Sequence, residues 1–231
     1  GSNRLVSIDE CDHTYAFDSF SVKALDHPLS VPLFLYVNPG QGNGERDSFV
    51  DFVMSTEAGQ GIVGKHFANL EVLIADEQAS RERIDIISRR EPELRNSQAL
   101  FRALIGNARR ISTTFRFRYD NSTLELDSYG ERALERLVSK VRDENISPEM
   151  IMLFGFADSL GEASYNLELA SRRADSVASG LAERGLTISK GNVFAIGEDA
   201  PVGCNLNGDG EIDERGTARN RRVEVWVRTE S

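Results

Sequence analysis

The stretch Ile151-Met152-Leu153-Phe154-Gly155-Phe156-Ala157-Asp158 is the part of this chain on which its interpretation depends. The apolar run that ends at Gly155 is typical of a buried strand that closes in a turn, and Asp158 follows just past it. Beyond Gly161, apolar residues recur at helical spacing, which places Arg173 in an early turn of a helix. Strand, loop and helix in this order are a common frame for holding a ligand.

Taken alone, these two charged residues have an ordinary structural explanation. An aspartate in a turn before a helix is most often a cap or a solvated residue, and an arginine beside another arginine is most often a surface charge. A ligand site at Asp158 and Arg173 therefore needs support from the rest of the chain.

Composition limits the class of protein. The chain has 231 residues, 40% hydrophobic and 28% charged, which is ordinary for folded domains, and we expect two of them. A net charge of -10 argues against binding nucleic acid or an anionic membrane through bulk electrostatics. No apolar run approaches the roughly 20 residues of a membrane span, and no signal-peptide pattern is present. Cys11 and Cys204 fit no metal pattern, and whether they pair stays open.

The pattern along the chain predicts three parts. Residues 1–75 are expected to form a partial α+β segment, with strands over 15–25 and 31–37, a helix starting at Asp47-Ser48 and a short helix over 56–63. Residues 76–111 are charged and broken by Pro92, and we expect a helical connector there. Residues 112–231 are expected to form a compact domain.

That domain is of the α/β (α+β) class. Alternation and apolar runs predict four strands, and helical periodicity predicts two helices between the first three of them, with the strands at 114–119, 151–154, 192–197 and 222–228 and the helices around 133–141 and over 165–183. Strands that alternate with helices imply a sheet with helices packed on it.

Short motifs spread over residues 113–228 occur in one order: Phe117, Leu124, Asp127; Gly155 to Asp158; Gly161; Tyr165-Asn166; Leu169; Arg172-Arg173-Ala174; Val177; Leu181; Gly197 to Val202; Gly216; and Arg219 to Val225. Together they resemble the C-terminal peptidoglycan-binding domain of the OmpA-like family. The resemblance implies a βαβαββ sandwich of two or more helices on a mixed four-stranded sheet. It also implies a non-catalytic domain that tethers a periplasmic protein to the cell wall of a Gram-negative envelope with its outer membrane.

The same resemblance implies that Asp158 and Arg173 hold the diaminopimelate of a peptidoglycan stem peptide. The free end of diaminopimelate is a zwitterion, so it needs an anionic acceptor for its ammonium group and a guanidinium group for its carboxylate. Family positions near the pocket correspond to Asp120, Asn166, Arg221 and Arg222. The chain departs from the family at Phe156-Ala157, where His-Thr is usual, and at Ala170, where Ser is frequent. We expect no enzyme, because the domain has no histidine, no G-x-S-x-G and no P-loop.

Residues 5–75 carry a second resemblance. Pro32 to Asn38, followed by Phe52 to Val63, resembles the closing segment of periplasmic phosphate-type substrate-binding proteins. The alternative function is therefore part of a phosphate-type ABC-transporter solute-binding protein whose ligand pocket is incomplete in this chain. The opening Gly1-Ser2 is typical of a cloning scar. We expect a leader or anchor upstream, and a membrane-bound or transporter partner reached through that region.

The segment between the third and fourth predicted strands copies part of the EF-hand calcium loop. Its oxygen-bearing side chains lie at loop positions 1, 3, 5, 7 and 9, and they are Asn205, Asn207, Asp209, Glu211 and Asp213. Position 12 is Gly216 instead of the bidentate glutamate. The sequence therefore leaves two readings open: an incomplete calcium site, or a polar insertion with Asn-Gly and Asp-Gly turns.

Overall fold

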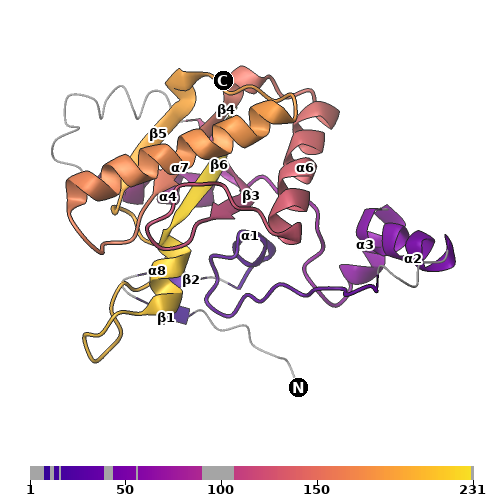
Figure 1. The fold of residues 1–231 in the computed structure, drawn as a ribbon, viewed down its shortest axis with the longest axis horizontal. Coiled ribbons are helices and arrows are strands. Elements are labelled where there is room, and N and C mark those ends of the chain that lie inside the picture. Colours follow the sequence, from indigo (N-terminus) through magenta and orange to yellow (C-terminus); the bar gives the residue numbers. More distant parts are fainter. Residues whose placement is uncertain are drawn as a thin grey trace. The chain divides into compact units, whose positions relative to one another are not determined.

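The protein is seen in a computed structural model that describes residues 8–10, 13–15, 17–38, 44–55, 57–89 and 107–229. The chain divides into two compact units (Figure 1). The larger unit comprises residues 1–28 and 72–231, and the smaller unit comprises residues 29–71.

A four-stranded mixed sheet is the centre of the larger unit. Its strands lie side by side in the order β3-β6-β4-β5, with β3 at Ala108–Arg116, β4 at Ile151–Phe156, β5 at Val193–Gly197 and β6 at Arg222–Arg228. The β4–β5 pair is parallel, and the β3–β6 and β4–β6 pairs are antiparallel. The predicted fold class is confirmed, and the last strand of the sequence is an inner strand of the sheet.

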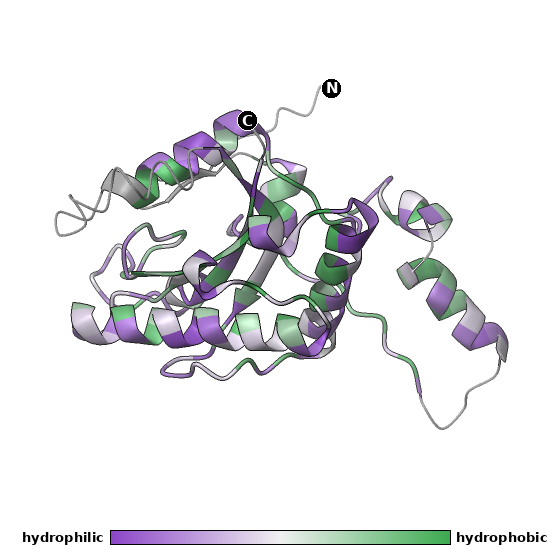
Figure 2. Ribbon diagram, turned by 90° about the horizontal axis from the view of Figure 1, so that it is seen from above, coloured by the Kyte–Doolittle hydropathy of each residue, from purple (hydrophilic) through white to green (hydrophobic). Residues whose placement is uncertain are grey.

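Two long helices cover one face of this sheet (Figures 1 and 2). They are α6, Ser128–Asp143, which Asp127 caps by accepting the Gly130 N–H at 2.8 Å, and α7, Ala163–Glu183. Both helices carry an apolar stripe that faces the valines of β6, namely Val223, Val225 and Val227. Helix α7 lies directly on β4, because a Cβ atom at Gly155 would be 2.1 Å from the Ala170 carbonyl oxygen.

The opposite face of the sheet is covered by α4, Glu77–Arg89. Its Ile84 and Ile87 pack with Trp226 and with Met152 and Phe154 of β4. The chain just before α4 lies along β3, where the Ser112 N–H donates to the Leu73 carbonyl at 2.8 Å. The predicted connector over 76–111 is therefore largely part of the larger unit, because its amphipathic helix has a sheet face to cover. The part of the predicted connector over residues 90–106 lies outside the described residues.

The N-terminal part of the chain also belongs to the larger unit. Strands β1, Ile8–Glu10, and β2, His13–Tyr15, form an antiparallel pair, and α1, Ser19–Lys23, follows. The predicted strand over 15–25 is wrong, because Asp18 caps α1 by accepting the Ser21 N–H at 2.8 Å. A domain boundary at residue 75 is likewise replaced by the division after residues 28 and 71.

The smaller unit contains an extended segment up to Asn38, then α2, Gly44–Ser55, and α3, Glu57–Val63. These helices agree with the predicted helix starts near residues 47 and 56. The Gln60 side chain donates to the Val53 carbonyl and accepts from the Leu70 N–H, which ties the two helices to the chain that follows. Within the described ranges, no helix is both long and apolar enough to cross a bilayer.

Short elements complete the larger unit. They are the 3-10 turns η2, Pro148–Met150, and η3, Lys190–Asn192, and the helix α8, Glu214–Asn220. Helix α8 leads directly into β6, and Arg221 is the residue between them. The cap of α8 at Asp213 and its last turn therefore fix the position of Arg221.

A buried network of ion pairs holds the α4 face of the sheet together. Glu224 is fully buried and lies 2.8 Å from Arg222, 2.9 Å from Arg83 and 3.3 Å from Arg110. Burial alone would raise the pKa of Glu224, but the guanidinium groups of Arg110, Arg83 and Arg222 outweigh it and hold that pKa well below its usual range.

Asp26 extends this network to the N-terminal segment. Its carboxylate pairs with Arg110, and it lies 3.0 Å from Arg116. Burial opposes the charged form here too, yet the two arginines lower the pKa of Asp26. Arg116 also donates to the carbonyls of Ala24 and Leu25, so the segment around residues 24–26 is held against β3 from both its backbone and its side chain.

We expect Asp26→Asn to lower the free energy of unfolding by about 3 kcal/mol or more, because it leaves the partly buried Arg116 without a carboxylate and the buried Arg110 with Glu224 alone. Urea unfolding measures this. Asp85→Asn on the exposed side of α4 is the control and should change stability by less than about 0.5 kcal/mol. Equal stabilities for the two variants would contradict the network's role.

We also expect the larger unit to lose stability in acid. A carboxylate whose pKa is lowered by folding stabilises the fold above its unfolded pKa, about 4, and this contribution is lost as the pH falls towards the folded value. Between pH 7 and pH 5, Asp26 and Glu224 should cause no change in the urea concentration at the unfolding midpoint. At pH values below about 4, that urea concentration should decrease. Asp26→Asn should show a shallower acid fall than the native chain.

Candidate functional site

A small pocket, partly open to solvent, lies where three connections of the larger unit meet. The loop after β3, the loop after β4 and the first turns of α7 each contribute side chains. Its lining residues are Tyr119, Asp120, Asp158, Leu160, Tyr165, Asn166, Leu169 and Arg173. The acid and the base singled out in the sequence therefore lie in one pocket.

Asp158 is 4% exposed and is one half of an ion pair. Its Oδ2 lies 2.8 Å from Nη1 of Arg221, and its Oδ1 accepts the Leu160 N–H at 3.1 Å. Arg221 is oriented in turn by donating from Nε to the Phe117 carbonyl at 3.2 Å. These contacts exclude a freely solvated side chain at Asp158 and fix the direction of its carboxylate.

Arg173 is fully buried and donates to three backbone carbonyls. Nε bonds to Asn121 at 2.9 Å, Nη1 to Phe156 at 3.2 Å and Nη2 to Arg118 at 3.2 Å. Burial lowers the pKa of Arg173 to about 10, against the favourable charge of Asp158, so the guanidinium group stays charged at neutral pH. Three of its five N–H groups position the side chain through these carbonyls.

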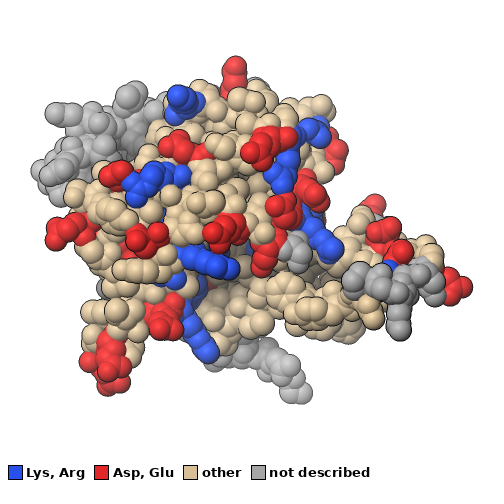
Figure 3. Space-filling model, viewed as in Figure 1, with Lys and Arg blue, Asp and Glu red and all other residues tan. Residues whose placement is uncertain are grey.

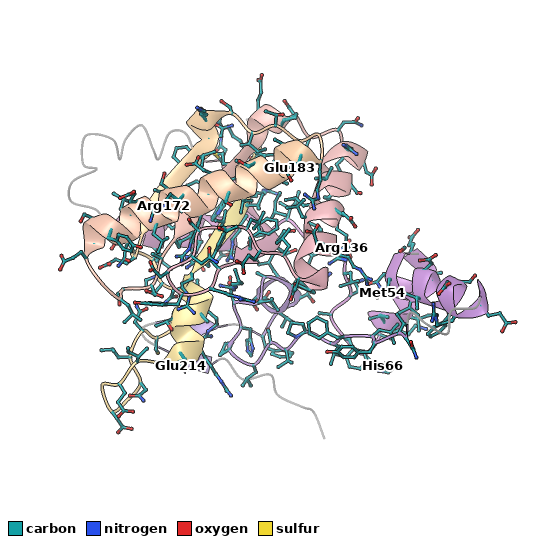
Figure 4. All side chains as sticks on the ribbon, in the orientation of Figure 1. Met54, His66, Arg136, Arg172, Glu183 and Glu214 are labelled. Atoms are coloured by element: carbon teal, nitrogen blue, oxygen red, sulfur yellow. The ribbon has the colours of Figure 1, made fainter. Side chains whose placement is uncertain are left out.

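The rim of the pocket is built by Asp120 and Tyr165. The Tyr165 hydroxyl donates to Asp120, whose backbone is left-handed at φ +48°, and this bond raises the pKa of Tyr165. The guanidinium of Arg172 lies 5.7 Å from the Tyr165 ring, on the part of α7 labelled in Figure 4. The tyrosine ring is thereby held in place at the pocket edge.

Asn166 links the pocket to the loop after β5. It is 1% exposed, and its Nδ2 donates to Oε2 of Glu198 at 2.6 Å. Sequence reasoning had assigned no role to Glu198 or to the rim tyrosines. The signal for Tyr119 was available, since Phe115 and Phe117 are buried and Tyr119 continues their alternation.

The charges around the pocket balance. Asp120 and Asp158 contribute two negative charges, and Arg173 and Arg221 contribute two positive ones. On the face shown in Figure 3, acidic and basic side chains are interspersed over α6 and α7. The pocket and its immediate surroundings therefore present both signs of charge.

Comparison with known proteins points to one family. The sequence profile described as "OmpA family" matches residues 116–215. Residues 116–215 form an OmpA-like domain. The chain is 33% identical over 118 residues to the peptidoglycan-associated lipoprotein of Pseudomonas putida, covering 51% of the chain and 64% of that protein. It is 33% identical over 111 residues to outer membrane protein A of Bordetella avium, covering 48% and 52%.

A solved structure, the peptidoglycan-associated lipoprotein from Burkholderia pseudomallei, matches with 24% identity and a TM-score of 0.40, covering 51% of this chain and 90% of that one. The chain spans between 13% and 64% of the length of the curated relatives that it matches. The resemblance of residues 5–75 to a phosphate-type protein finds no support in these comparisons.

The OmpA-like domain does not bring Arg222 to the pocket. Along β6, Arg222 and Glu224 face α4, whereas Val223 faces α6 and α7. Arg222 is fully buried beneath Phe156, with its guanidinium 3.8 Å from the ring, and burial lowers its pKa to about 9. Of the two predicted neighbours, only Arg221 therefore contacts a pocket residue.

The departures from the family at Phe156-Ala157 have a packing explanation. Phe156 is fully buried between the α4-face arginines and the Arg173 guanidinium, to which its carbonyl oxygen is bonded. Ala157 is 2% exposed, and its N–H donates to the Gly197 carbonyl at 2.7 Å. Neither side chain lines the pocket of the OmpA-like domain.

The loop over residues 205–213 is a turn and not an assembled calcium site. Asn207 Oδ1 accepts the N–H groups of Asp209 and Glu211, and Asp213 caps α8 through the N–H groups of Arg215 and Gly216. Asn205 accepts from Ser159 N–H and Asn220. In the described part of the chain, no group of three or more His, Cys, Asp or Glu side chains can hold a metal ion. These hydrogen bonds favour the second of the two readings, a polar insertion held by its own turns.

Cys204 is disulfide-bonded, so it is not a free thiol. Cys11, the other cysteine of the chain, lies outside the described residues. The open question of the sequence is thus answered for Cys204.

We expect Arg221→Gln to destabilise the OmpA-like domain by about 2–3 kcal/mol, because it strands the buried Asp158 carboxylate. The double variant with Asp158→Asn should recover part of the loss, giving a coupling energy above about 1 kcal/mol by urea unfolding. The same cycle on the more exposed pair Lys140–Glu144 should give less than about 0.5 kcal/mol. Additive losses at Asp158 and Arg221 would contradict a structural ion pair.

Proposed function

We propose that the OmpA-like domain binds peptidoglycan without catalysis and anchors the protein to the cell wall in the periplasm. The observation that carries this proposal is the pocket that holds Asp158 and Arg173 together. The family match and the relatives named for their association with peptidoglycan support it. The proposed role needs a stable charge-balanced pocket and no reacting group.

The proposed ligand is the free end of diaminopimelate in the stem peptide. Its ammonium group would approach the carboxylates of Asp158 and Asp120, and its carboxylate would approach the two N–H groups that Arg173 has left. Tyr165, held by Asp120, would close one side of the pocket. Because each ligand charge meets an opposite charge, a chain with a net charge of -10 can bind it.

The alternative, part of a phosphate-type ABC-transporter solute-binding protein with a transporter partner, has no support among the reported relatives. The pocket of the larger unit does not favour this alternative either. Acidic and basic side chains already pair there, and a phosphate group would add negative charge without a counter-charge. We therefore propose the wall-anchoring function alone.

Calorimetric titration with meso-diaminopimelate tests the proposal. Asp158→Asn should weaken binding at least tenfold, because it removes the acceptor for the ammonium group. Asp175→Asn, on the exposed side of α7, is the matched control and should bind as the native chain does. Retention on purified peptidoglycan should follow the same order.

A change of ligand provides a test that leaves the protein intact. In a stem peptide, lysine in place of diaminopimelate keeps the terminal ammonium group and lacks the carboxylate beside it, so the lysine-containing peptide should bind at least tenfold more weakly than the diaminopimelate-containing one if Arg173 holds that carboxylate. Arg173→Lys is expected to lose the same discrimination, with its melting temperature measured alongside, because Arg173 also supports three backbone carbonyls. Equal binding of both ligands, or equal binding by Asp158→Asn, would refute the proposed site.

A further inference from the structure

Residues 31–37 of the smaller unit form an extended apolar segment that is open to solvent. Its large side chains are between 45% and 89% exposed, and they are Val31, Leu33, Phe34, Leu35, Tyr36 and Val37. None of these residues makes a backbone hydrogen bond with any residue that the structure describes. The backbone polar groups of these seven consecutive residues thus have no hydrogen-bond partner among the described residues.

The segment has no assigned secondary structure, but its composition is that of a strand. Phe34 and Tyr36 share one side, with ring centroids 6.4 Å apart, as residues two apart do in a strand. Val31, Leu33, Leu35 and Val37 then share the other side. An isolated strand that is apolar on both sides and unpaired at both edges is a template for pairing with another chain.

We propose that residues 31–37 pair with the same segment of a second copy of this chain, as antiparallel strands about a two-fold axis. The first argument is charge. Two copies that each carry a net charge of -10 repel, but residues 28–44 contain no Asp, Glu, Lys or Arg, so this segment can meet its mate without placing like charges in contact. A two-fold contact also closes at two copies.

The second argument is area. The exposed side chains of residues 29–37 carry on the order of 800 Å² of accessible surface, which is what one partner contributes to a standard-size interface. Phe49 and Phe52 add to it, since they are 59% and 39% exposed and lie three residues apart on one side of α2.

Pro32 selects the register. A proline has no N–H and must occupy a position whose N–H would point away from the partner strand. With Phe34 opposite Phe34 of the second copy as a non-hydrogen-bonded pair, Pro32 falls opposite Tyr36 in another such pair. Leu33 and Leu35 then face each other across the axis in hydrogen-bonded pairs. The same register places the two Phe34 Cα atoms about 4.5 Å apart, within the range of a disulfide.

The consequence for wall binding, which rests on the proposed function, is bivalency. Two joined OmpA-like domains would bind the wall with a second attachment at high effective concentration. The proposal of pairing stands separately, because oligomeric state can be measured without any wall ligand.

Cysteine cross-linking tests the pairing and its register. Phe34→Cys should give a covalent dimer on mild oxidation of the native-length chain, seen on a non-reducing gel. Val31→Cys is the matched control, because two copies of residue 31 lie six residues out of register and should cross-link at least tenfold less. Equal yields from both variants would overturn the register and with it the paired strand.

Sedimentation of charge variants tests the pairing without a cross-link. The double variant Leu33→Glu, Leu35→Glu places glutamates opposite each other and should be monomeric at concentrations where the native chain is dimeric. Leu33→Glu with Leu35→Lys places opposite charges across the axis and should recover dimer. The proposal would be overturned if the native chain is monomeric or forms aggregates larger than a dimer. It would also be overturned if the double glutamate variant remains dimeric. A monomeric native chain would mean that the segment binds a different partner.

Discussion

Glu224 can lie at the centre of the sheet only because guanidinium groups surround it. A lone carboxylate would not stay charged in a dry sheet face, since the cost of removing it from water far exceeds what one neutral hydrogen bond returns. Three arginines, together with the Trp226 N–H at 3.2 Å, meet both of its oxygens. The arginines come from α4, β3 and β6, so a single carboxylate fixes the relative position of three elements.

Two adjacent residues connect the ion-pair network around Glu224 to the pocket. Arg221 and Arg222 leave the start of β6 in opposite directions, one towards Asp158 and the other towards Glu224. Phe156 joins the two sides, because its ring lies under Arg222 and its carbonyl accepts from Arg173. A shift of β6 would therefore disturb both sides of the sheet at once. The pocket is therefore tied to the sheet through ion pairs and hydrogen bonds at the strand ends, and not only to loops.

The sequence pattern predicted the helices and strands whose formation depends on residues close together in the sequence. The apolar run before Gly155 became β4, and the helical periodicity after Gly161 became α7 over residues 163–183. The failures share a cause. Asp26 meets Arg110 across 84 positions of sequence, so the placement of the N-terminal segment against β3 left no local signal. Residues 19–23 alternate enough to suggest a strand, and the cap at Asp18 decided otherwise.

Some residues of the candidate site could be predicted from the sequence and others could not, for the same reason. Asp158 and Arg173 could be named from the sequence because their elements are contiguous and their motif is spread in a recognisable order. Arg222 could not be told from Arg221, since the choice depends on which face of β6 each side chain takes, and one residue of register exchanges them. The loop over residues 205–213 carries the oxygen atoms of a calcium site, but three of its five candidate side chains already accept hydrogen bonds that hold the turn, α8 and the loop after β4.

Charge balance in the pocket has a further physical consequence. Asp158 is already paired with Arg221, so a ligand that offers only a positive charge must compete with a well-placed guanidinium group and leaves the site with an excess of one charge. A ligand that offers both signs can share Asp158 while it supplies a carboxylate to the arginines, and the balance of two acids and two bases is unchanged. In a small, half-dry pocket such an imbalance costs far more than it would in water. Under the proposed function, the preformed ion pair would therefore discriminate against ligands that carry only one sign of charge.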